Sequence, residues 1–192
     1  MTELFLVFIA ACLANNLILD HLLGVSPVFA VSRTIETAIG MSMAMLIVLP
    51  LTTLSCYALE LLILSPLNLE FLRLIAFVIT VTLVTFSVEK ILKRIRPALH
   101  DKISVFIPLL LMNTSLVGVA LLDIQQQNGV IVSLLFGMGT ALGFGIIVLI
   151  FTALRQRIVV ADVPIPFQGV SILLMTLGII SMAFMGFIGI AK

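Results

Sequence analysis

The chain has 192 residues, of which 62% are hydrophobic and 10% are charged, and its mean hydropathy is +1.35. Soluble globular domains contain about 45–50% apolar and about 25% charged residues, so this composition excludes a soluble domain and predicts an integral membrane protein. The formal net charge of +1, with no basic patch that carries interleaved aromatic residues, gives no support to nucleic-acid binding.

Six apolar segments are long enough to cross a bilayer, which takes about 20 residues of helix. The N-terminal segment lacks the basic cluster of a signal peptide, so we keep it as the first span. The two cysteines, Cys12 and Cys56, lie inside apolar segments and are expected to be small buried hydrophobic residues. The expected spans are Leu4–Leu23, Thr37–Leu64, Phe71–Leu92, Ile103–Leu122, Val130–Leu154 and Val170–Ile190.

Lysine and arginine lie almost entirely in the segments that follow spans one, three and five. Eight lie there, whereas only Arg73 and Lys192 lie on the other side. The positive-inside rule therefore predicts that these three linkers face the cytoplasm and that both termini lie outside. The eight are Arg33, Lys90, Lys93, Arg94, Arg96, Lys102, Arg155 and Arg157.

Two features recur in the second half of the chain. Phe8-Ile9 followed by Asn15-Asn16 returns 98 positions later as Phe106-Ile107 followed by Asn113-Thr114-Ser115. Gly40-Met41 with Ala44 returns 97 positions later as Gly137-Met138 with Ala141. Because each half has three spans, the second half enters the membrane inverted. We predict one all-α membrane domain, 1–192, built as a 3+3 inverted repeat of residues 1–97 and 98–192.

The recurring asparagines predict a polar site inside the membrane. Uncompensated amide groups are costly in hydrocarbon, which makes an intramembrane polar cluster a functional-site hypothesis. We expect Gly24 and Pro27 to break span one and Pro108 and Gly118 to bracket a break in span four. Ordinary kinked helices whose asparagines bond to neighbouring helices are the alternative. The predicted site residues are Asn15, Asn16, Asn113 and Ser115.

Span five carries closely spaced glycines, which predict close helix packing. The sequence has no Walker loop, no zinc-binding His-Glu helix and no Ser/His/Asp arrangement, so it predicts neither a catalytic residue nor a metal ligand set.

Nearly the whole chain resembles the A/E-type membrane subunits of the Rnf and Nqr ion-translocating oxidoreductases, most closely those of A type. The resemblance implies a six-helix inverted-repeat subunit of the bacterial inner membrane with both termini in the periplasm. It also implies a homologous partner subunit of opposite orientation in a multi-subunit complex that couples electron flow between NADH and ferredoxin or quinone to Na⁺ or H⁺ movement. The matching stretches are Asn15-Asn16, Leu23-Gly24, Val31-Ser32, Glu36 to Ala38, Pro66 to Leu69, Pro108-Leu109, Asn113, Gly118 to Leu122, Ala161 to Pro164 and Ala183 to Phe187.

In that family each broken helix carries a cysteine, and these cysteines with the partner's pair hold a [2Fe–2S] cluster. One cysteine lies in a Gly-x-Cys-Pro stretch and the other directly follows the span-four asparagine. The matching positions here are Ser26 and Thr114. Iron–sulfur clusters need thiolates, for which an un-ionised hydroxyl is a poor substitute. Cys12 precedes Ser26 by 14 residues, close to four helical turns. We therefore expect no cofactor in this chain and no ligation by Ser26 or Thr114.

Four interpretations remain open. In the first, the chain is a translocase subunit that keeps the ion-coupling role, without being catalytic alone, while electrons take another route. In the second it is a cluster-free ion or small-solute carrier, and in the third a purely structural subunit. In the fourth it is a variant engineered to lack the family's two cluster cysteines. The resemblance favours the first.

Overall fold

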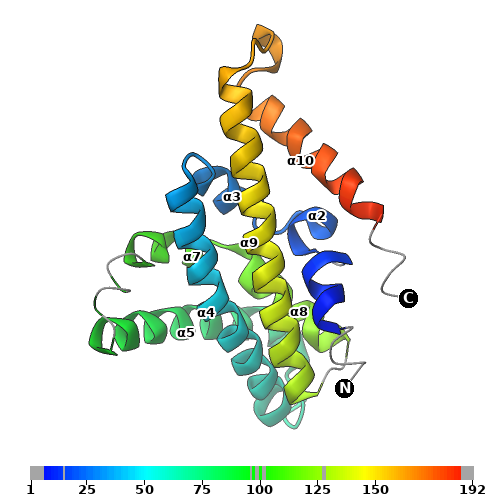
Figure 1. The fold of residues 1–192 in the computed structure, drawn as a ribbon. Coiled ribbons are helices and arrows are strands. Elements are labelled where there is room, and N and C mark those ends of the chain that lie inside the picture. The colour runs from blue at the N-terminus through cyan, green and yellow to red at the C-terminus, as the bar shows by residue number, and fades with distance from the viewer. Residues whose placement is uncertain are drawn as a thin grey trace.

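The computed structural model describes residues 7–14, 16–95, 97, 100, 103–126 and 129–186, and all regular structure in this part of the chain is helical. The expected all-α fold is thus confirmed. Two long helices, α4 (Ile35–Leu59) and α9 (Val130–Val160), lie side by side through the centre of the molecule, and the other helices surround them (Figure 1).

The centre of the molecule is packed through small residues. A Cβ atom placed on Gly137 of α9 would overlap Thr53 Oγ1 and lie 3.0 Å from Pro50 Cα, both on α4. A Cβ atom on Gly143 would overlap the backbone oxygen of Cys12. Small residues let membrane helices approach this closely, so dispersion contacts can stabilise helices that are apolar on every side. The packing role expected for the span-five glycines is confirmed.

The second and third spans form close to where hydropathy places them. The α4 helix continues as a π-helical turn, η2 (Glu60–Leu64), and the chain then reverses through Asn68, whose φ is +54°. A short 3₁₀ turn, η3 (Glu70–Leu72), leads into α5 (Arg73–Ile95). Asparagine tolerates the left-handed region better than most residues, which suits it to this turn.

The fifth span is longer than expected and the sixth is shorter. The α9 helix runs six residues beyond Leu154, carrying Arg155 and Arg157 past the apolar stretch. A linker containing η5 (Ile165–Phe167) follows. The last helix, α10 (Val170–Phe184), has 15 residues, fewer than the roughly 20 that a span needs, and 187–190 of the expected span lie outside the described residues.

In the part of the chain that the structure describes, three helical segments are long and apolar enough to cross a membrane, and a bent pair makes a fourth if it is one span. The expectation of six spans is thus supported in part. The three segments are Ile35–Leu64, Glu70–Ile95 and Val130–Val160, and the bent pair is Ser104–Leu111 with Thr114–Gln125.

In its described part, the expected span Leu4–Leu23 is divided into two short elements, η1 (Ala10–Ala14) and α2 (Leu17–His21), and a third, α3 (Val25–Val31), follows it. Between α2 and α3 the chain reverses through Leu22, with φ +52°, and Gly24, with φ +78°. Pro27 does not break this segment, contrary to the sequence prediction. It is the third residue of α3, in the first turn, where a helix has no use for the amide donor that proline lacks.

The fourth span is bent between Pro108 and Gly118, as expected. It consists of η4 (Ser104–Phe106), α7 (Ile107–Leu111) and α8 (Thr114–Gln125), with a bend of 58° between α7 and α8. Pro108 lies in the first turn of α7 and Gly118 lies within α8, where a Cβ atom would overlap a methyl group of Leu23. Neither residue causes the break, which falls at Met112-Asn113.

Candidate functional site

Asn113 stabilises the broken fourth span by capping α8. Its side chain is 2% exposed, and its Oδ1 accepts a hydrogen bond from the backbone N–H of Ser115 at 2.9 Å. Its Nδ2 lies 3.4 Å from Met45 Sδ on α4. The first turn of a helix leaves backbone N–H groups without partners, and an asparagine side chain at the N-cap satisfies one of them.

Asn16 has the same role at the start of α2. It is also 2% exposed, its Oδ1 accepts from the N–H of Ile18 at 3.1 Å, and its Nδ2 donates to the backbone oxygen of Cys12 at 3.0 Å. Asn15 lies outside the described residues. The two asparagines with matching roles are therefore Asn16 and Asn113, which are 97 positions apart, the same spacing as Gly40 and Gly137. The repeat seen in the sequence aligns Asn15 with Asn113, which are 98 positions apart and therefore one residue off this spacing.

The start of α3 meets the start of α8 at Gly24. The N–H of Gly24 donates to Thr114 Oγ1 at 3.2 Å. A Cβ atom on Gly24 would overlap Ser115 Oγ and lie 3.2 Å from Asn113 Oδ1 and 3.3 Å from a ring carbon of Phe144. The left-handed backbone and the close approach both require glycine here. The structure thus places Asn113, Thr114 and Ser115 around one backbone position of the other broken segment.

Three hydroxyl groups lie at or near this junction. Ser26, the second residue of α3, and Thr114, the first residue of α8, are exposed. Ser115 is fully buried, and its Oγ has no hydrogen-bond partner within the described ranges. Asn16 does not join this group through a hydrogen bond, because its described bonds stay within its own segment and its amide faces Gly143 of α9.

The donor set at the junction does not fit an iron–sulfur cluster. The groups present are hydroxyl and amide oxygens, whereas such clusters are held by thiolates. Cys12 and Cys56 are free thiols buried elsewhere in the packing. Within the part of the chain that the structure describes, no three His, Cys, Asp or Glu residues are grouped so that they could hold a metal ion.

The sequence marks Arg155 only as one of the basic residues that indicate orientation, but the residue also anchors the far end of α3. Its Nη1 donates to the backbone oxygen of Phe29 and to Ser32 Oγ, both at 2.6 Å. A cation at a helix C-terminus satisfies free carbonyl groups and interacts favourably with the helix dipole. A positive charge 25 residues into a long apolar helix is the signal that points to such a role.

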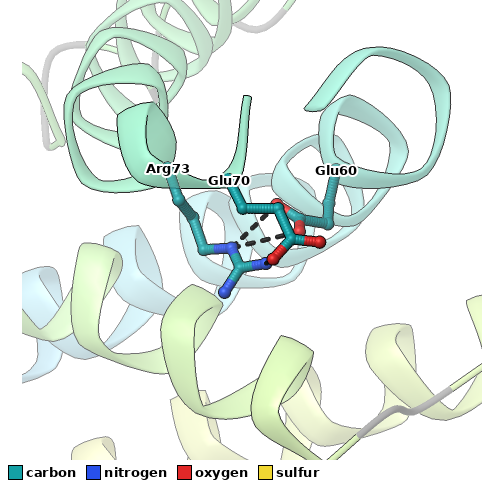
Figure 2. A network of polar contacts seen from close by, with 3 residues as sticks. All are labelled: Glu60, Glu70 and Arg73. Atoms are coloured by element: carbon teal, nitrogen blue, oxygen red, sulfur yellow. Dashed lines mark hydrogen bonds and ion pairs between the residues drawn. The ribbon is translucent and has the colours of Figure 1, made fainter. Parts of the chain in front are cut away.

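A second polar group, also missed from the sequence, lies where η2 meets α5. Arg73 points at Glu60 and Glu70, with its Nε 3.0 Å from both carboxylate oxygens of Glu60 (Figure 2). Glu70 is a more distant partner at 3.8 Å and is largely exposed. A carboxylate such as Glu60 inside the apolar stretch Leu59–Leu64 is the signal that would have drawn attention to this group.

Long apolar helices, with two broken segments whose ends are capped by buried asparagines, define a multi-pass membrane protein with interrupted helices at its core. The chain belongs to the Rnf-Nqr family, because the model of that family, described as Rnf-Nqr subunit, membrane protein, matches residues 4–191. It is similar over the full length of both chains to proteins named as the A-type subunit of the ion-translocating oxidoreductase complex. The identity is 42% in Vibrio atlanticus, 42% in Thioalkalivibrio sulfidiphilus and 43% in Pseudoalteromonas atlantica, each over 192 residues.

Proposed function

We propose that this chain is a membrane subunit of an Rnf-type complex of the bacterial inner membrane, which couples electron transfer to the translocation of Na⁺ or H⁺. The observation that carries the proposal is the similarity to the A-type subunits, which extends over 100% of both chains. The chain supplies a membrane-embedded part of the complex and is not catalytic alone.

The proposed architecture has six spans in a 3+3 inverted repeat, residues 1–97 and 98–192, with both termini in the periplasm. Two matched contacts support it. Asn113 of the second half packs against Met45 of α4 in the first half, and Asn16 of the first half packs against Gly143 of α9 in the second. A pseudo-twofold axis in the membrane plane exchanges such contacts. The Lys and Arg distribution supports the orientation.

The proposed polar site comprises Asn15, Asn16, Asn113 and Ser115, with Ser26 and Thr114 at the family's cysteine positions. Its donors are oxygens, which suit a hard cation better than an iron–sulfur cluster. We infer that Ser26 and Thr114 do not hold a [2Fe–2S] cluster and that electrons pass through the complex by another route. The exposed side chains of Ser26 and Thr114 leave this junction open to a homologous subunit of opposite orientation.

Reconstitution of the complex in liposomes tests this function. With NADH and ferredoxin as the electron pair, we expect electron-driven uptake of Na⁺ or H⁺ that is lost when this subunit is omitted. Ion uptake that proceeds at the same rate without any electron donor would identify a carrier instead. Uptake that persists without the subunit would leave it no role in coupling.

A further inference from the structure

A cavity of about 460 Å³ lies between the end of α9 and the start of α10. The two helices are joined by the linker 161–169 and diverge from it (Figure 1). The cavity walls are mainly aliphatic and include Ile158, Val159, Ile172 and Leu173. Among the described residues, Arg155 is the only charged one that lines it. A mainly apolar space lined by one cation matches an amphipathic anion rather than a small polar solute.

The positive charge at this cavity has no counter-charge in the described part of the chain. Arg155 and Arg33 act on one another electrostatically, and neither forms an ion pair with a described carboxylate. Asp162, in the adjoining linker, does not line the cavity. Two like charges repel one another more strongly in a medium of low polarity than in water, and an anion between or beside them relieves the repulsion.

Arg155 also has hydrogen-bonding capacity to spare. Both of its hydrogen bonds come from Nη1, so the Nε and Nη2 groups make no hydrogen bond to the described residues. An arginine guanidinium presents its donors as a planar fork that matches two oxygens of a phosphate group. The Gln168 side chain at the cavity edge already donates to the backbone oxygen of Val163 at 2.9 Å, so it is held in place and does not compete for Arg155.

We propose that this cavity binds an anionic phospholipid, with the phosphodiester on the Arg155 guanidinium and an acyl chain along the aliphatic walls. In the orientation proposed above, this end of α9 faces the cytoplasm, where basic pockets between membrane helices are suited to anionic headgroups. Because Arg155 also holds Phe29 and Ser32 at the end of α3, the bound lipid stabilises the broken segment that carries Ser26.

Lipid binding to the purified complex tests the proposal by native mass spectrometry, with phosphatidylglycerol compared against phosphatidylethanolamine. We expect phosphatidylglycerol to bind more tightly, and R155Q to weaken it about fivefold, the factor that corresponds to about 1 kcal/mol for one arginine near an anionic headgroup. I172W fills the cavity without removing charge and should weaken binding to a similar extent. R157Q, an exposed arginine on the same helix that does not line the cavity, is the matched control and should change binding less than twofold.

Glutamine at position 155 keeps a donor for Phe29, and I172W gives an independent readout if R155Q does not assemble. Equal binding of the two lipids, or equal losses in R155Q and R157Q, would overturn the proposal. Displacement of the lipid by millimolar inorganic phosphate would reduce the site to a free-anion site and overturn it as well. Binding to the isolated chain but not to the complex would show that a partner subunit occupies the cavity, which also overturns the proposal.

Discussion

Replacing Gly24 with alanine tests the contact at which the two broken segments meet. Gly24 has φ +78°, where an L residue loses roughly 1–2 kcal/mol. The added Cβ atom would also overlap Ser115 Oγ, and overpacking of this kind costs about 1–3 kcal/mol. The two terms together predict a loss of about 2–5 kcal/mol in the free energy of unfolding of G24A.

A double-mutant cycle separates the two terms. S115A removes the atom that the new Cβ overlaps and leaves Asn113 Oδ1 and a Phe144 ring carbon at 3.2 and 3.3 Å, so G24A should cost only about 1–2 kcal/mol in that background. The expected coupling energy between the two positions is therefore about 1–3 kcal/mol. Reversible denaturation by SDS in mixed micelles, followed by circular dichroism, measures each corner of the cycle.

Gly178 provides the control, because it lies in α10 and no described residue comes within 4 Å of an added Cβ atom. G178A should leave stability unchanged or raise it by up to about 1 kcal/mol, since alanine favours the helix. The reasoning is refuted if G24A is as well tolerated as G178A. It is also refuted if G24A and S115A are additive to within about 0.5 kcal/mol, which is the expectation for residues that do not touch.

Two further predictions concern the polar groups. N113A removes the cap of α8 and should cost about 1 kcal/mol, whereas N113S keeps a capping oxygen and should cost a few tenths; equal losses in the same denaturation assay would argue against capping. E60A leaves Arg73 without its main partner and should cost about 1.5–3 kcal/mol, the range for a hydrogen bond to a charged group. E70A removes only the distant, exposed partner and should cost less than about 0.5 kcal/mol; a larger loss for E70A than for E60A would contradict the geometry in Figure 2.

The long helices were predictable from the sequence because their signal is local. About 20 consecutive apolar residues suffice to mark a span, and α4, α5 and α9 begin within two residues of the expected positions. The C-terminal ends were less accurate. The α9 helix continues past Leu154 through Arg155, whose guanidinium bonds to the end of α3, and through Arg157, which is exposed.

Glycine and proline marked the breaks only in part: Gly24 lies at the break in the first segment, as expected, but the prolines do not cause either break. Pro27 and Pro108 lie in first turns, where proline is tolerated, and Gly118 lies inside a helix to accommodate Leu23. The bend in span four depends instead on Asn113, whose side chain replaces a backbone partner for Ser115. That hydrogen bond depends on the local backbone conformation, which residue type does not specify.

The candidate site was partly predictable. The sequence identifies Asn113, Thr114 and Ser115 as unusual, and the structure places all three around Gly24. The sequence does not reveal that Asn16 directs its amide to its own segment and to α9. The direction in which a polar side chain points depends on tertiary packing between the two halves of the chain. For the same reason, the contact of Arg155 with α3 spans 126 residues in sequence and has no local signal.

The central claim, that an Rnf-type subunit has lost its cluster ligands, is tested most directly by optical and EPR spectra of the reduced chain purified with its partner subunit. We predict no [2Fe–2S] signal in the wild-type protein and a signal in the variant that carries both S26C and T114C. A wild-type [2Fe–2S] signal that disappears in C12A or C56A would contradict the account.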